Sequence, residues 1–124
     1  MANPSTEGGT GAGTEVLRRF YKTDLTDTEV KIIDGVADHI YTVLSICILE
    51  RGNQNDHKFF LGVNPEGNAS NRVDFLYNQS IGGRELFMWN DKVVLTGTDE
   101  LVISASAGSS NFDVWCSYID QTFA

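Results

Sequence analysis

The sequence predicts an all-β protein: an antiparallel β-sandwich or jelly-roll-like barrel with an extended N-terminal arm. Short segments rich in β-branched and aromatic residues recur along the 124-residue chain. Clusters of Gly, Asn, Asp and Pro separate these segments at intervals of about 8 to 12 residues, and no segment has a convincing helical period. Many short strands joined by such turns are typical of sandwiches and jelly rolls, and the length fits one domain.

The first 13 residues form a low-complexity segment dominated by Gly, Ser and Thr. Its glycines are Gly8, Gly9, Gly11 and Gly13. Such a composition cannot bury enough apolar surface to offset its ordering entropy, which is about 1–2 kcal/mol per residue for the backbone. We therefore expect residues 1–13 to be a flexible docking arm that a partner orders by strand addition, and residues 14–124 to be the sandwich domain.

The segment that directly follows the arm, residues 14–21, reads as a strand. Val16, Leu17 and Phe20 are its apolar anchors. Because this strand joins the arm to the sandwich, we count these three side chains, together with the four glycines of the arm, among the candidate partner-binding residues.

The next segment, residues 23–35, has two competing interpretations. Thr26 and Glu29 fit a helix capping box. Three β-branched residues follow, and Gly35 comes too early for a stable helix. These features favour a strand over residues 28–33.

The strongest strand signal covers residues 39–52, where both alternating sets of side chains are largely apolar. Such a pattern predicts a strand covered on both faces. The segment 64–67 (Asn-Pro-Glu-Gly) predicts a type I turn. The remaining predicted strands are residues 57–63, 72–77, 85–89, 92–95, 101–107 and 112–119.

Aromatic residues supply the other candidates for partner binding. In the last strand the even residues, including Phe112 and Cys116, form an apolar face, whereas the odd residues form a mixed face. Trp115 and Ile119 on that mixed face fit a protein interface or a covered sandwich edge, and Trp89 ends another aromatic run. A sugar-stacking platform made of Trp89, Trp115 and Tyr77 is an alternative that the sequence leaves open.

Composition and motifs exclude several classes of function. The net charge is −8 with no cluster of basic residues, so neither nucleic acid nor an anionic membrane is an expected partner. No catalytic motif, metal-ligand spacing or phosphate-binding loop occurs, so we expect no enzyme, cofactor or metal. Cys47 and Cys116 lack the Tyr and Trp spacing of immunoglobulin domains and are expected to be two buried, reduced thiols.

The order of segments from about residue 39 to residue 120 resembles the small all-β virion proteins of tailed bacteriophages, among them those of marine and cyanobacterial phages. In that group a Leu-x-x-Gly-Asp-x-Leu/Ile hairpin precedes an Ala-Ser strand and a closing Val-x-x-Ser-Tyr-x-Glu/Asp strand. The matching positions here are Leu95, Gly97, Leu101, Ala105, Ser106, Val114, Ser117, Tyr118 and Asp120. The pattern departs at Thr98, which stands between Gly97 and Asp99.

This resemblance implies a virion structural role without enzymatic activity. The expected function is a capsid decoration or cement protein that docks on neighbouring subunits through its arm. A neck, collar or tail accessory protein and a carbohydrate- or receptor-binding module are the alternatives. The expected partners are other virion proteins, namely major capsid, portal, neck or tail subunits, and further copies of the chain, with a trimer favoured. With neither a signal peptide nor an apolar run long enough for a membrane span, we expect assembly in the host cytoplasm.

Overall fold

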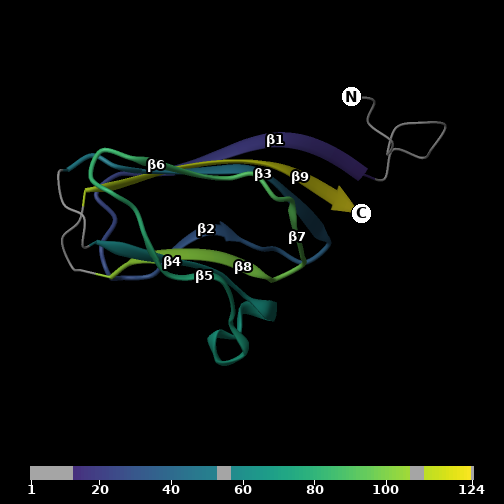
Figure 1. The fold of residues 1–124 in the computed structure, drawn as a ribbon. Helices are drawn as coiled ribbons and strands as arrows, with labels where there is room; N and C mark the ends of the chain where they lie inside the picture. The colour runs from purple at the N-terminus through teal and green to yellow at the C-terminus, as the bar shows by residue number, and fades with distance from the viewer. Residues whose placement is uncertain (1–12, 53–56, 107–110, 124) are drawn as a thin grey trace.

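The computed structural model of the chain describes residues 13–52, 57–106 and 111–123, which form two facing antiparallel sheets (Figure 1). The strands are β1 (Gly13–Lys22), β2 (Val30–Asp34), β3 (His39–Glu50), β4 (Lys58–Asn64), β5 (Val73–Ser80), β6 (Leu86–Trp89), β7 (Val93–Thr96), β8 (Glu100–Ala105) and β9 (Phe112–Phe123). Two single-turn helices, η2 (Pro65–Gly67) and η3 (Ala69–Asn71), join β4 to β5. The predicted arm lies outside the described residues except for Gly13, so its docking role stays a prediction.

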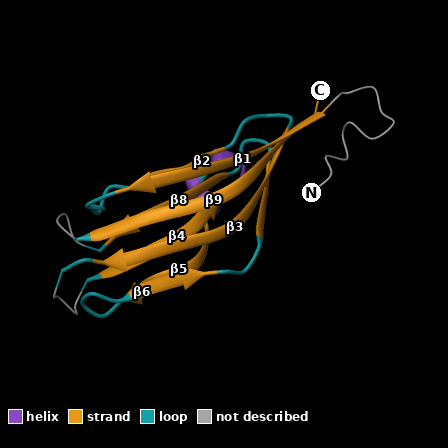
Figure 2. Cartoon of the chain, turned by 90° about the horizontal axis from the view of Figure 1, so that it is seen from above, coloured by secondary structure: helices purple, strands orange, loops and turns teal. Residues whose placement is uncertain are grey.

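The strand order confirms a β-sandwich of the jelly-roll type. Sheet A has the order β1-β9-β3-β6, with β7 also paired to β3, and sheet B has the order β2-β8-β4-β5. The pairs are nested along the chain: β4 with β5, β3 with β6 and β7, β2 with β8, and β1 with β9. When β6 and β7 are counted as one interrupted strand, these are the eight strands of a jelly roll. Figure 2 shows β1 and β2 at the same edge of the sandwich.

The hydrophobic core fills the space between the two sheets. An aromatic cluster stands at its centre, where the ring of Phe59 lies 5.5 Å from that of Phe87 and 6.0 Å from that of Phe112, both edge to face. Edge-to-face contacts of this kind add to the stabilisation that burial of the rings provides. The even residues of β9 up to Cys116 point into this core, as the alternation in the last strand predicts.

A bulge in β3 corrects the prediction that this strand is covered on both faces. The β3–β9 register shifts between Val43 and Ser45, so Leu44 is an extra residue. Below the bulge, Tyr41 and Val43 are buried; above it, the buried residues are Ile46 and Ile48. The side chains of β3 that face the core therefore switch from odd-numbered to even-numbered positions at the bulge. This switch makes both alternating sets of the strand look apolar in the sequence.

Two turn regions show which local signals decide the fold. Residues 23–35 contain a strand, β2, as the β-branched residues predict, and no helix begins at the capping-box pattern. The predicted type I turn at 64–67 is wrong, because Glu66 and Gly67 have φ of 56° and 72° and the backbone N–H of Asn68 donates to the carbonyl of Pro65 at 2.9 Å. Two left-handed central residues are the mark of a type I′ turn. The backbone N–H of Glu66 donates to Asp99 at 2.8 Å, and this tertiary bond holds the turn in that form.

Within the described ranges, no helix has both the length and the apolar character that crossing a membrane requires.

Candidate interaction surface

The outward side of sheet A carries a broad set of exposed apolar side chains, which we call the sheet A face. Alternation along each strand points one set of residues into the core and the other set outward. The outward set comes from all five strands of the sheet and includes Leu17, Tyr21, Cys47, Leu49, Leu86, Met88, Val94 and Trp115. Leu17 is 74% exposed and Trp115 is 45% exposed, so the described residues leave this face open to solvent. Contiguous apolar surface of this kind marks an interaction site in soluble proteins.

Trp115 lies near the centre of the sheet A face and is braced by β1. The ring of Tyr21, its cross-strand neighbour, stacks on the indole with a centroid separation of 6.0 Å and an interplanar angle of 21°. The Arg19 guanidinium carbon lies 5.3 Å from the centroid of the Trp115 ring and 5.4 Å from that of Tyr21. Cation–π contacts hold such a cluster in one arrangement, so this part of the face is presented as a preformed surface.

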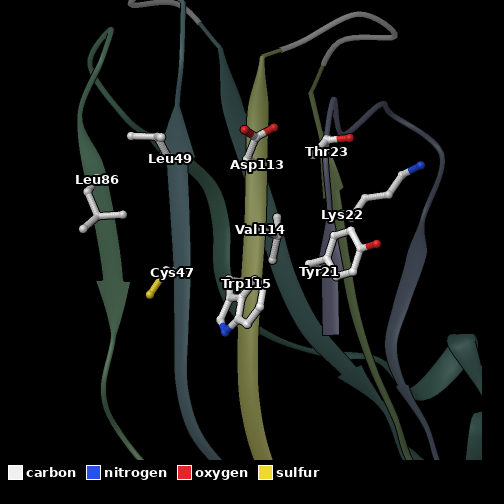
Figure 3. A pocket seen from close by; sticks show the side chains of 9 residues that line it. All are labelled: Tyr21, Lys22, Thr23, Cys47, Leu49, Leu86, Asp113, Val114 and Trp115. Atoms are coloured by element: carbon white, nitrogen blue, oxygen red, sulfur yellow. The ribbon is translucent and has the colours of Figure 1, made fainter. Parts of the chain in front are cut away.

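An open groove of about 360 Å³ runs across the sheet beside Trp115 (Figure 3). The close-up shows Asp113 and Trp115 along β9, with Tyr21 on one side and Cys47, Leu49 and Leu86 on the other. Its other lining residues are Lys22, Thr23 and Val114. The floor is therefore apolar and the polar groups are confined to its borders, which suits a protein side chain or a flat ring better than a charged small molecule.

Asp113, the carboxylate that lines this groove, is engaged in an ion pair. The Nε of Arg51 lies 2.8 Å from the Oδ2 of Asp113, and its guanidinium also contacts Asp24. The hydrogen bond from Arg51 to Asp113 is the main reason that the pKa of the Arg51 guanidinium is raised above its ordinary value. Asp113 therefore helps to hold the end of β3 against the loop after β1.

A second polar cluster lies at the opposite end of sheet A, on its inner side. Asp120 is almost fully buried; it accepts a hydrogen bond from the Nε of Arg18 at 2.8 Å and lies 2.7 Å from the Nδ1 of His39. Tyr41 and Tyr118 flank it, and burial raises the pKa of both hydroxyls. Because its three polar members come from β1, β9 and β3, this cluster ties the three strands together.

The described residues contain no group of three His, Cys, Asp or Glu side chains able to hold a metal ion. Besides His39 with Asp120, a second His–carboxylate pair is Glu50 with His57, where Oε2 and Nδ1 are 3.6 Å apart. Both side chains are enclosed, and Glu50 also accepts from the backbone N–H of Gly52 at 2.9 Å. The oxygen that accepts from Gly52 is Oε1, whereas Oε2 and the Nδ1 of His57 are buried without a hydrogen-bond partner among the described residues.

The structure separates the candidate partner-binding residues into three groups. Leu17, Trp115 and Ile119 lie on the sheet A face, whereas Val16 points to the other side of β1 and is partly exposed. Phe20 and Trp89 pack against the core, and the Trp89 ring stacks on Phe75 at 5.9 Å. The arm residues Gly8, Gly9 and Gly11 lie outside the described residues, and Gly13 begins β1.

Several residues of the sheet A face are absent from the sequence-based candidates. Arg19 and Tyr21 alternate with Leu17 along β1, so the i, i+2 spacing would have found them once one exposed member was known. Leu86 and Met88 come from a strand of only four residues, where alternation is too short to assign a face. Tyr77 lies on β5 of sheet B, so Trp89, Trp115 and Tyr77 do not form one sugar platform.

The fold and this surface define a jelly-roll protein with an open apolar sheet, and the fold is similar to that of chains in several solved viral structures. No protein-family model matches the sequence. No curated protein matches it either. Among solved structures, a chain of infectious bursal disease virus, Gx strain, is similar over 90% of this chain and 32% of that chain, with 7% identity and a TM-score of 0.55.

Two further structures show the same likeness. A chain of the T13 particle of infectious bursal disease virus matches with 8% identity and a TM-score of 0.51, over 90% of this chain and 31% of that chain. A chain of the acid-stable capsid structure of Helicobacter pylori bacteriophage KHP30 matches with 10% identity and a TM-score of 0.50, over 87% of this chain and 91% of that chain. The chain thus spans about a third of the bursal disease virus chains that it matches. At these identities the likeness shows the fold alone.

Proposed function

We propose that this chain is a structural protein of a bacteriophage virion and has no enzymatic activity, and that it serves as an accessory decoration or cement protein. The sheet A face carries the proposal. A jelly roll whose described residues present a broad set of exposed apolar side chains, and contain no group able to hold a metal ion, is equipped to bind protein rather than to transform a substrate. The likeness to a chain of a phage capsid structure supports the same class.

The finer form of the proposal names where the chain binds. It sits on the head, contacts the major capsid protein through the sheet A face, and reaches a neighbouring subunit through residues 1–13. It assembles in the host cytoplasm without a cofactor, and further copies of the chain associate with it, a trimer being the expected group. A neck, collar or tail position is the alternative, in which portal or tail subunits take the place of the capsid protein.

Copy number separates these positions. Gradient-purified particles of the phage that carries this sequence should contain the chain, as measured by quantitative mass spectrometry against the major capsid protein. A copy number close to that of the major capsid protein supports a decoration role, and a few copies per particle support a position at the neck or tail. Absence of the chain from particles contradicts the virion proposal.

A matched pair of variants tests the surface. Leu86 on the sheet A face is 57% exposed and Val73 on sheet B is 51% exposed, so a carboxylate can be placed at either without burying charge. Leu86→Glu should lower occupancy on particles, whereas Val73→Glu should leave it unchanged. Deleting residues 1–13 tests the arm separately, and undiminished binding of that variant would remove the arm from the proposal.

Glycan or receptor binding is the second candidate, because the stacked pair of Tyr21 and Trp115 offers a flat, exposed aromatic surface. A glycan array with the wild-type chain and Trp115→Ala decides between the two. Binding that disappears in the variant supports this candidate, and no signal at millimolar glycan argues against it.

A further inference from the structure

The outer edge of β1 is a free edge within the described part of the chain. β1 ends the strand order of sheet A, and within the described residues no strand lies beyond it. It runs for 10 residues in unbroken register with β9 and contains no proline. Natural proteins shield such edges with short strands, bulges, prolines, charged side chains or cover from another element, because an open edge recruits another strand. β1 has none of the first three protections.

The charge of this edge differs from that of the rest of the chain. Three of the nine basic residues, Arg18, Arg19 and Lys22, lie on β1 together with one acidic residue, Glu15, whereas the whole chain carries −8. Arg18 is neutralised by Asp120 within the same copy. The β1 strand therefore carries a net positive charge, and a second acidic copy meets less repulsion there than the charge of the whole chain implies.

The sequence of β1 is complementary to itself in one antiparallel register. Residues directly opposite each other in an antiparallel pair point to the same face, so a continuous sheet A face requires outward residues to oppose outward residues. Centring the pair on Leu17 places Glu15 of each copy opposite Arg19 of the other. The two Leu17 side chains then face each other on the twofold axis. Two cross-strand ion pairs flank one apolar pair.

Neighbouring registers lose this complementarity. A pair centred on Arg18 sets Arg18 of one copy opposite Arg18 of the other. A pair centred on Arg19 likewise sets the two Arg19 residues opposite each other. A pair centred on Val16 leaves Glu15 opposite Leu17 with no ion pair. In the Leu17 register the two Lys22 residues are ten positions apart, roughly 33 Å, which is beyond the range of screened repulsion at physiological salt.

We propose that two copies of this chain pair through β1, antiparallel about a twofold axis at Leu17, and so join two A sheets into one continuous sheet. The sheet A faces of both copies then lie on the same side and form one extended apolar surface. This inference rests on the self-association in the proposed function and names its contact. In a particle built of trimers, the same contact links one trimer to the next.

Disulfide trapping in the isolated full-length chain tests the register. Both variants carry Cys47→Ser, which removes the outward-pointing native thiol, while Cys116 stays in the core. In Leu17→Cys the paired residues have Cα atoms about 5 Å apart, within disulfide range. In Arg19→Cys the two new thiols are four positions apart, about 13 Å, and out of reach. Mild oxidation should convert Leu17→Cys to a covalent dimer and leave Arg19→Cys monomeric on non-reducing gels.

A charge swap tests the ion pairs by sedimentation equilibrium. Arg19→Glu should weaken dimerisation about tenfold or more, because two cross-strand attractions become two repulsions. Adding Glu15→Arg to the same chain restores the opposite charges across the axis and should restore most of the affinity. A merely local role of Arg19, on the Trp115 ring, would not be rescued by this second change.

The proposal is overturned by any of three results. The first is a wild-type chain that stays monomeric at high micromolar concentration. The second is equal trapping of the Leu17→Cys and Arg19→Cys variants. The third is a charge swap that fails to restore association although circular dichroism shows a folded sheet. These measurements use the isolated chain. They can therefore contradict the β1 pairing while the protein is still found on virions, or support the pairing while the protein is absent from virions.

Discussion

Cys47 and Cys116 lie one position apart across the β3–β9 pair, yet their side chains point to opposite sides of sheet A. Cys116 is opposite Ile46 and faces the core, whereas Cys47 is opposite Trp115 and faces outward. The expectation of two buried thiols is therefore right for Cys116 and wrong for Cys47, which is only half-buried. Both are free, and their opposite directions prevent a disulfide without rearrangement of the strands.

This arrangement predicts that the folded protein has one reactive thiol. Burial raises the pKa of Cys116 to about 12, so its thiolate is scarce at pH 8 as well as enclosed. Titration with a chromogenic disulfide at pH 8 should give one equivalent in buffer and two in denaturant. Cys47→Ser should abolish the fast equivalent. Rapid reaction of that variant would show that the core opens easily around Cys116.

The buried carboxylate of Asp120 should be a large contributor to stability. In Asp120→Asn, Arg18 loses its anionic partner and His39 its charged acceptor, so we expect the free energy of unfolding to fall by about 1–3 kcal/mol. Urea denaturation measures the change. The control is Asp34→Asn, where the side chain is 69% exposed and 3.9 Å from Lys31; there the change should stay within about 0.5 kcal/mol. Equal effects of the two variants would contradict a structural role for the Asp120 cluster.

The ion pair between Lys31 and Glu100 predicts a loss of stability in acid. The hydrogen bond from Lys31, 2.9 Å away, holds the pKa of Glu100 below its usual 4.5, and Asn64 adds a second bond. The contribution of a carboxyl with a lowered pKa is fully present above its unfolded pKa and is lost as the pH falls through its folded pKa. We therefore expect urea midpoints to fall from about pH 5 downward. Glu100→Gln should flatten this decline.

Lys31→Met is the complementary variant, because it removes the main cause of the lowered pKa of Glu100. Its acid decline should be shallower than that of the wild-type chain but steeper than that of Glu100→Gln, because the bond from Asn64 to Glu100 remains. The hydrogen bond to Glu100 is the chief reason that the pKa of Lys31 is raised. The wild-type chain should therefore lose the contribution of Lys31 to its stability once the pH rises above about 10.5. An acid decline unchanged in both variants would assign it to other carboxyls.

A close approach of two loops makes Gly35 hard to replace. Its backbone N–H donates to the carbonyl of Asp99 at 3.0 Å, and a Cβ there would collide with the carbonyl oxygens of Gly97 and Asp99. Gly35→Ala should therefore cost about 1–3 kcal/mol in thermal or urea unfolding. Gly82→Ala is the control, because a Cβ at that position meets only the flexible side chain of Glu85. A tolerated Gly35→Ala would show that the turn between β7 and β8 can move.

Local patterns were sufficient to predict the class of fold and the approximate position of every strand. Alternation assigned the faces of β9 correctly, since that strand keeps one phase from Phe112 to Cys116. It failed in β3, where the extra residue Leu44 leaves no signal in residue types alone. The left-handed turn at Glu66 is not predictable for a related reason: the backbone N–H of Glu66 donates to the carboxylate of Asp99, which lies 33 positions away in the sequence.

The candidate surface was only partly predictable. Leu17, Trp115 and Ile119 are candidates because of their apolar character, and all three lie on the sheet A face. Trp89 is a candidate for the same reason but packs inward against Phe75. Which side of a sheet an aromatic residue occupies depends on strand register, and register depends on pairing between distant segments. The Asp120 cluster was out of reach for the same reason, because Arg18, His39 and Asp120 meet only after β1, β3 and β9 have paired.

The nested order of the strand pairs has a consequence for the folding sequence. β4 and β5 are joined by a short loop, whereas the β1–β9 pair sets Gly13 against Phe123 and closes nearly the whole described chain. Loop-closure entropy favours forming the inner pair first, since each pair then shortens the loop that the next must close. On this order β1 is the last strand to join the sheet. The edge that it offers to a second copy exists only once the domain is complete, so unfinished chains are kept out of the assembly.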